Sequence, residues 1–294
     1  AFLAIAEIYF KKSEWAKAQS FYDKSIETSN NESKGYATYR LAWAHFNQGH
    51  APVAKEKLLT ILKTPALLSK SGSNQAVTDV AFHEQVAKDY AIICGANFEE
   101  SDLKNIFEFS PEKKRLENLF AVSSELERTA KKKEALIAWN FLYQNQPQPQ
   151  DRAVTKAHLA TVNLQLGKNT EALKDINEAY SLIAEAKVKF PNEAEDARRL
   201  IKSSIITWNQ AEKKKPSAEL LEAYQGYLTN YGYEKEMSQW AVQIAGDLKK
   251  WDVAWNIHKT ATAGITVNSK DPKTAATDFE NHLLLGIELG ESSK

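Results

Sequence analysis

The apolar positions of the chain follow a repeating pattern of two helices joined by a short polar turn. In the first copy, Ile5-Ala6-x2-Tyr9 is followed, twelve residues after Ala6, by Ala18-x3-Tyr22. The spacing of three and four residues between these positions predicts a helix on each side of the turn. The same pattern, with one small residue in each helix, recurs at Ala42 and Ala54, at Ala160 and Ala172, and, with a weaker first helix, at Ser123 and Ala135.

Helix packing explains why small residues recur in each helix. Two helices cross at short distance only where a small side chain of one faces the other, and protein interiors are close-packed. We expect Ala6 to face Ala18, with Tyr9, Trp15 and Tyr22 filling the space around them. Each pair of helices is therefore predicted to be a compact hairpin.

The second-helix alanines also predict how many pairs there are. Their separations are 36, 81, 37 and 82 residues, for Ala18, Ala54, Ala135, Ala172 and Ala254. Because the large gaps are near twice the small ones, each should contain one further, degenerate pair, at about 75–110 and about 192–232. Prolines and glycines fall at the expected ends and turns, and Gly49, Gly95 and Gly167 are predicted between paired helices. About seven pairs result.

This pattern resembles the tetratricopeptide repeat (TPR) family. The resemblance implies an all-α fold: a right-handed α-solenoid of about seven TPR-like helix pairs, some degenerate, with a terminal helix. We divide the chain into residues 1–66 (two regular repeats), 67–114 (a loop and a degenerate pair), 115–190 (two repeats), 191–262 (longer degenerate pairs) and 263–294 (a loop and a terminal helix at Thr277–Leu289).

Composition agrees with a helical protein and excludes several classes. The 294 residues include only 11 Gly and 8 Pro, few enough for an all-α chain. Lys and Arg together number 38 and so do Asp and Glu, which removes the basic excess of a nucleic-acid-binding protein. The longest uncharged stretch, Ala135–Gln150, is Gln-, Asn- and Pro-rich in its second half, so no bilayer span is expected.

No catalytic or metal-binding motif stands out. The single cysteine, Cys94, excludes an internal disulfide framework and a multi-thiolate cluster, and we expect a buried, inert thiol. His83-Glu84 begins like a zinc-protease motif, but Ala87 replaces its second histidine. His45 and His258 occupy positions that aromatic residues normally hold in the repeat, which predicts a packing role. We therefore expect no enzyme activity, cofactor, metal or small-molecule substrate.

The groove-facing positions of the family, projected onto the second repeat, select an aromatic strip with one arginine. Aromatic and arginine side chains are enriched at binding hot spots, so the predicted partner-binding residues are Tyr36, Tyr39, Arg40, Trp43, Phe46 and Asn47. The alternative is that the same residues pack against a neighbouring repeat. Leu3 and Glu7 occupy positions that hold a peptide carboxylate in chaperone-binding TPR proteins, so an apolar or proline-rich peptide or a helix is the expected ligand.

Lysine runs are predicted near the turns that join paired helices, at Lys11-Lys12, Lys131–Lys133, Lys213–Lys215 and Lys249-Lys250. They are typical of solvated turns, with contact to an acidic partner or a peripheral contact to anionic lipid as the alternative.

The sequence thus predicts a non-enzymatic scaffold that binds a peptide or protein in its concave groove. A self-assembling structural subunit that links copies through its edges or end repeats stays as one alternative. A regulatory domain of a larger enzyme is the other, because the chain begins at Ala1 inside an apolar pattern and is read as a fragment. The chain also resembles bacterial TPR proteins, including those of envelope and motility complexes, which implies an envelope or periplasmic setting, with the cytoplasm as the alternative.

Overall fold

A computed structural model describes residues 1–28, 31–69, 77–186 and 189–262, together with 280, 284, 286, 287 and 291. Across these residues it contains fourteen α-helices and two short 3-10 helices, η1 (Pro65–Leu68) and η2 (Glu112–Lys114), and no strand. One β-bridge joins Ser69 and Thr78. In the same residues no helix is long and apolar enough to cross a membrane.

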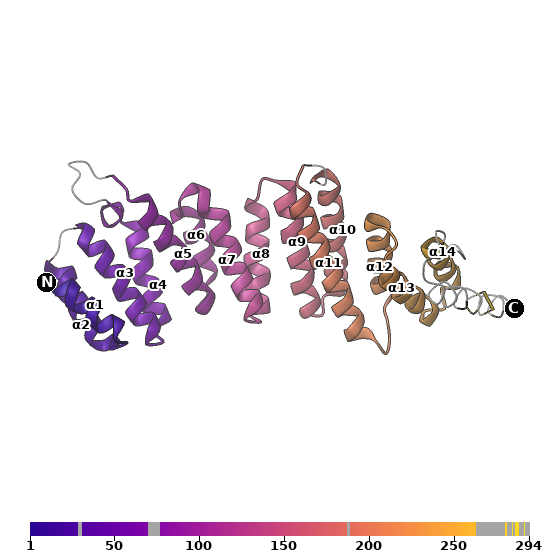
Figure 1. Cartoon of the computed structure of the whole chain (residues 1–294), viewed down its shortest axis with the longest axis horizontal. Helices are drawn as coiled ribbons and strands as arrows, with labels where there is room; N and C mark the ends of the chain where they lie inside the picture. Colours follow the sequence, from indigo (N-terminus) through magenta and orange to yellow (C-terminus); the bar gives the residue numbers. More distant parts are fainter. Residues whose placement is uncertain are drawn as a thin grey trace, which may run out of the picture. The chain divides into compact units, whose positions relative to one another are not determined.

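The α-helices form seven successive pairs (Figure 1). The predicted all-α repeat of about seven pairs is therefore confirmed. The pairs are α1 (Phe2–Lys11) with α2 (Trp15–Thr28), α3 (Asn31–Asn47) with α4 (Ala51–Lys63), α5 (Val80–Ala96) with α6 (Glu100–Phe109), α7 (Arg115–Arg128) with α8 (Lys132–Asn145), α9 (Pro149–Gln165) with α10 (Asn169–Ala186), α11 (Pro191–Glu212) with α12 (Ala218–Tyr231), and α13 (Lys235–Asp247) with α14 (Trp251–Thr262).

The pairs are distributed over two compact units, Ala1–Gln146 with four pairs and Pro147–Lys294 with three. In the first unit, successive pairs meet where α2 packs on α3, α4 on α5, and α5 on α7. In the second, α9 packs on α11, α10 on α12, and α12 on α13. The five-segment division made from the sequence stays a prediction. Most of its last segment, including the residues Ala263–Lys273 and nearly all of the predicted helix Thr277–Leu289, lies outside the described residues, as does most of the predicted loop at Leu67–Asn74.

The small residues lie where the pattern predicts them. Each predicted couple is fully buried, with 0% of every side chain exposed: Ala6 and Ala18, Ala42 and Ala54, Ser123 and Ala135, Ala160 and Ala172. In the first pair, Tyr22 is also fully buried, and Tyr9 and Phe10 pack against the same cluster. Close helix crossing at small side chains therefore sets the geometry of each pair.

Five of the seven turns between paired helices use one residue in the left-handed backbone region. Its φ is +82° at Gly49 and +72° at Gly167, and +58°, +58° and +57° at Ser13, Ala130 and Lys249. This conformation ends a helix and reverses the chain within two or three residues. Glycine adopts it without steric cost, whereas a residue with a Cβ atom is strained there.

The structure corrects the predicted position of Gly95. The sequence pattern places it in a turn, but it lies inside α5 and is buried. The Cβ atom of any other residue there would lie 2.6 Å from Cγ of Glu125 on α7, so glycine allows the close approach of two helices. The neighbouring Cys94 is buried as expected, and burial raises the pKa of its thiol well above the usual range.

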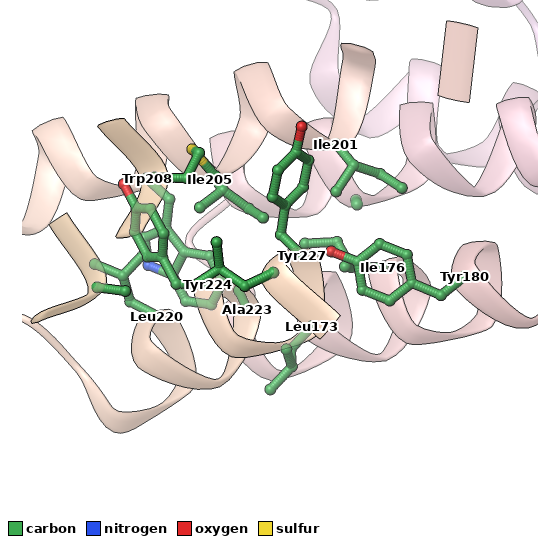
Figure 2. Close-up of a cluster of buried hydrophobic side chains, with 14 of the residues drawn as sticks. Leu173, Ile176, Tyr180, Ile201, Ile205, Trp208, Leu220, Ala223, Tyr224 and Tyr227 are labelled. Carbon is green, nitrogen blue, oxygen red and sulfur yellow. The ribbon is translucent and has the colours of Figure 1, made fainter. Parts of the chain in front are cut away.

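The core of the second unit extends from α9 to α14, and its buried aromatic side chains lie on α10, α11 and α12. Figure 2 shows Tyr180 of α10 and Tyr227 of α12 converging with Ile201 and Ile205 of α11. Trp208 and Tyr224 extend the same cluster, and both are at least 97% buried. These aromatic rings fill the space between α10, α11 and α12.

Glu234, at the start of α13, connects three helices in this unit. Its carboxylate accepts hydrogen bonds from Arg198 and Lys202 of α11, and from the Tyr227 hydroxyl at 2.7 Å. Burial opposes the charged form, but the hydrogen bonds from Lys202, Tyr227 and Arg198 outweigh it and lower the pKa of Glu234 to about 2. The carboxylate is therefore charged throughout the neutral range.

We expect Ala18→Leu to lower the free energy of unfolding by about 1–3 kcal/mol, because the added side chain has no space between α1 and α2. Ala16→Leu, on the exposed side of the same helix, is the matched control and should change the free energy by less than about 0.5 kcal/mol. Urea unfolding followed by circular dichroism measures both. Equal effects of the two substitutions would contradict the close crossing.

We expect Glu234→Gln to reduce the dependence of the free energy of unfolding on pH in the acid range. Because the folded-state pKa of about 2 lies below the ordinary value of 4.5, the charged carboxylate contributes stability above pH 4.5 that is lost as the pH falls towards 2. The difference in urea midpoint between wild type and Glu234→Gln should shrink over that window. A difference independent of pH would show that the charge has no part in holding α11 to α13.

Candidate functional site

The six residues predicted from the sequence lie on the second helix pair, all on α3. We call them the α3 face: Tyr36, Tyr39, Arg40, Trp43, Phe46 and Asn47. Tyr36 and Asn47 are exposed, Tyr36 to 42%, and the other four are half-buried. Partly exposed aromatic rings on one helix are what a binding surface requires, so the contacts of each side chain decide what the surface offers.

Asp89 of α5 is the polar centre beside the α3 face. It is 4% exposed. Its Oδ2 atom accepts hydrogen bonds from the Tyr39 hydroxyl at 2.7 Å and from the Trp43 indole Nε1 at 3.1 Å. Its Oδ1 atom accepts one from Nε2 of Gln85, one helical turn earlier, at 3.0 Å. Three neutral donors therefore hold a buried carboxylate and fix two of the aromatic side chains.

The start of α5 determines where Asp89 lies. Asp79 caps the helix by accepting a hydrogen bond from the backbone N–H of Phe82 at 3.1 Å. Phe82 then meets Tyr39 edge-on, with the ring centroids 5.6 Å apart. This ring contact and the hydrogen bonds to Asp89 therefore join α3 to α5, in addition to the packing of α4 on α5.

Burial, together with the hydrogen bond to Asp89, raises the pKa of Tyr39 to about 12. The phenol is therefore protonated at neutral pH and keeps its donor role.

The side chain of Arg40 connects the second helix pair to the first. Its Nε and Nη2 atoms donate to the two carboxylate oxygens of Glu7 on α1, at 2.8 and 3.0 Å. Its guanidinium also lies 3.8 Å from the centre of the Phe10 ring, and Glu7 accepts a further hydrogen bond from Tyr22 at 2.6 Å. A bidentate, stacked arginine is a strong and rigid contact.

The remaining rings of the α3 face support each other. Tyr36 lies beside Tyr39, with centroids 6.3 Å apart, and Trp43 meets Phe46 edge-on at 5.6 Å. Sequence reasoning selected these residues but missed Asp89, Gln85 and Phe82, because they lie on a degenerate pair about 40 to 50 residues away. Only the apolar spacing of that pair pointed to a helix there.

Hollows elsewhere in the described residues include the following two. One, of about 180 Å³, lies between α11 and α13, and its apolar side chains are Trp240, Ile206, Ile244 and Pro216. The second is a shallow hollow by α6, α7 and α8, where Phe107 and Phe141 meet edge-on and Arg115 lies over Phe107. In the described part of the chain, no three His, Cys, Asp or Glu side chains could hold a metal ion together.

The lysine runs lie at the turns between paired helices, as predicted. Lys131 also has a structural contact, because its Nζ atom donates to the backbone carbonyls of Gly95 and Ala96 at 2.9 and 2.7 Å. It thereby satisfies the last carbonyls of α5, which have no partner within their own helix.

Comparison with known proteins finds similarity in structure only. No protein-family model and no curated protein matches the sequence. The C-terminal part of a TPR repeat-containing protein from Cytophaga hutchinsonii is 12% identical, with 94% of this chain and 98% of that one covered and a TM-score of 0.39. The P58(IPK) TPR domain is 11% identical, with 100% and 98% covered and a TM-score of 0.28. A circular tandem repeat protein with a novel repeat topology is 11% identical, with 99% and 76% covered and a TM-score of 0.30.

The chain has a TPR-like fold. This statement rests on its own seven helix pairs and on the buried small residues twelve positions apart. Because unrelated functions share one fold, the fold alone does not identify the partner of this chain.

We expect Tyr39→Phe to lower the free energy of unfolding by about 1–3 kcal/mol, since it removes one of the three donors that satisfy the buried carboxylate of Asp89. Tyr36→Phe removes the same hydroxyl from an exposed ring and should change it by less than about 0.5 kcal/mol. Urea unfolding of the two variants side by side measures the difference. If both substitutions were neutral, the hydrogen bond to Asp89 would have no stabilising role.

Proposed function

We propose that the protein is a non-enzymatic scaffold that binds a peptide or protein segment on the α3 face. The TPR-like fold supports a role in protein–protein interaction in general. The observation that carries the specific site is a set of partly exposed side chains held in place by carboxylates: Asp89 holds the rings of Tyr39 and Trp43, and Glu7 holds Arg40. Fixed side chains lose little conformational entropy when a ligand binds.

The division of roles within the α3 face follows from its contacts. The polar ends of Tyr39, Arg40 and Trp43 bond to neighbouring helices, so their rings and stems are what a ligand would meet. Tyr36 and Asn47 are exposed and supply free polar groups at the two ends of the strip. An apolar segment with a few backbone hydrogen bonds, extended or helical, suits this surface.

The resemblance to bacterial TPR proteins of envelope and motility complexes supports a multiprotein assembly of that kind as the setting. Self-assembly is the second candidate, because α1 carries three exposed apolar side chains, Phe2, Ile5 and Ile8, at 38%, 36% and 54% exposure. Clustered exposed apolar groups mark contact surfaces. Light scattering separates the two, since self-assembly gives a mass above the 33.1 kDa of one chain.

We expect Tyr36→Ala/Phe46→Ala to weaken binding of a partner, because it removes aromatic area and leaves all three donors to Asp89 in place. The matched control is Phe120→Ala/Tyr233→Ala, which removes two exposed aromatic rings elsewhere. The partner is captured on immobilised wild-type chain, identified by mass spectrometry, purified and titrated by calorimetry.

The dissociation constant should rise at least about tenfold for the first variant, a loss of about 1.4 kcal/mol, and stay unchanged for the control. Circular dichroism verifies that both variants are folded. Equal affinity of wild type and Tyr36→Ala/Phe46→Ala would show that the α3 face serves packing between repeats only.

A further inference from the structure

The three buried aspartates of the described residues differ in how their charge is balanced. Asp102 accepts from Lys55 at 3.0 Å, and Asp175 accepts from Lys156 at 2.7 Å. Asp89 is equally buried, at 4% exposure, but its three hydrogen-bond donors are a phenol, an indole and an amide. Within the described part of the chain, no cation pairs with it.

Two carboxylates hold side chains of the α3 face. Glu7 forms a bidentate ion pair with Arg40, whereas Asp89 accepts hydrogen bonds from neutral donors. A buried carboxylate without a counter-ion costs folding energy, and its field is weakly screened because little water surrounds it. A cation brought to the adjacent surface would reduce that cost.

We infer that the segment bound on the α3 face contributes a basic side chain, lysine or arginine, which lies over the rings of Tyr36 and Tyr39 with Asp89 as its buried counter-charge. The inference rests on the proposed function and specifies its ligand. Aromatic faces attract cations within about 6 Å of the ring centre. The Tyr39 hydroxyl, which donates a hydrogen bond to Asp89, links the ring to the carboxylate.

The surface of α5 extends the site for a long basic side chain. Gln85, Asp89 and Ile92 follow one another at four and three residues, which places them along one face of the helix. Gln85 is exposed, and Ile92 is 40% exposed. The methylene stem of a lysine or arginine would cover Ile92 while its charged end reaches the rings beside Asp89. An acidic or neutral side chain would gain nothing from the carboxylate.

The test uses the whole chain and four blocked tripeptides, Gly-Arg-Gly, Gly-Lys-Gly, Gly-Gln-Gly and Gly-Glu-Gly. Binding is followed by NMR on the indole N–H signal of Trp43, which is assigned by its absence in Trp43→Phe. The arginine and lysine tripeptides should shift this signal and saturate below roughly 20 mM, as contacts of this strength give millimolar affinity. The glutamine and glutamate tripeptides should not.

Asp89→Asn removes the charge and keeps an acceptor for Tyr39 and Trp43, and it should weaken binding of the arginine tripeptide at least fivefold. Glu84→Gln removes one negative charge from another face of α5 and should leave binding unchanged. Ile92→Glu, at an exposed position, adds a negative charge to the proposed site and should tighten binding severalfold. This last variant keeps the test valid if Asp89→Asn fails to fold.

The inference is overturned if the glutamine tripeptide shifts the Trp43 signal as strongly as the arginine one, if no tripeptide shifts it, or if neither Asp89→Asn nor Ile92→Glu changes the affinity. The proposed function is tested separately with the purified partner. A partner that loses affinity for Tyr36→Ala/Phe46→Ala but not for Asp89→Asn would uphold the binding face and refute the basic ligand. A partner unaffected by either variant would refute both.

Discussion

The close approach of paired helices at small side chains is the constraint on which the rest of the structure depends. Ala6 and Ala18, and likewise Ala42 and Ala54, are fully buried twelve residues apart. This crossing fixes the position of each helical hairpin. It therefore also fixes which face of α3 contacts α1 and α5. The proposed binding surface follows from the geometry of the helix pairs.

This constraint explains why the fold could be read from sequence. The twelve-residue spacing and the doubled gaps between alanines give the number of pairs, even where the repeat is degenerate. Gly95 shows the limit of such reading. Glycine is required both in turns and where helices approach closely, and only the position of Glu125 on another pair distinguishes the two cases.

The candidate site could be predicted only in part for a related reason. Helical periodicity identifies residues that share a face, so Tyr39 and Trp43 could be placed together on α3. It does not identify what a side chain meets across a pair boundary. The contacts of Tyr39 with Asp89 and of Arg40 with Glu7 span 50 and 33 residues. These contacts confirm the packing interpretation for Tyr39, Arg40 and Trp43, and a binding role of the same side chains stays a prediction.

The hydrogen bonds from Tyr39 and Trp43 to Asp89 have an energetic consequence. A scaffold needs rings that stay in place without a ligand, and hydrogen bonds from ring to carboxylate provide this. Elsewhere the chain balances buried carboxylates with lysines, as Lys55 does for Asp102. Asp102 also accepts from the Tyr90 hydroxyl at 3.0 Å, so a lysine and a tyrosine share that carboxylate, whereas the donors to Asp89 are all neutral. Holding the aromatic rings through neutral donors leaves Asp89 without a cationic partner among the described residues, so the rigidity of these rings and the proposed attraction of the surface for cations have one structural origin.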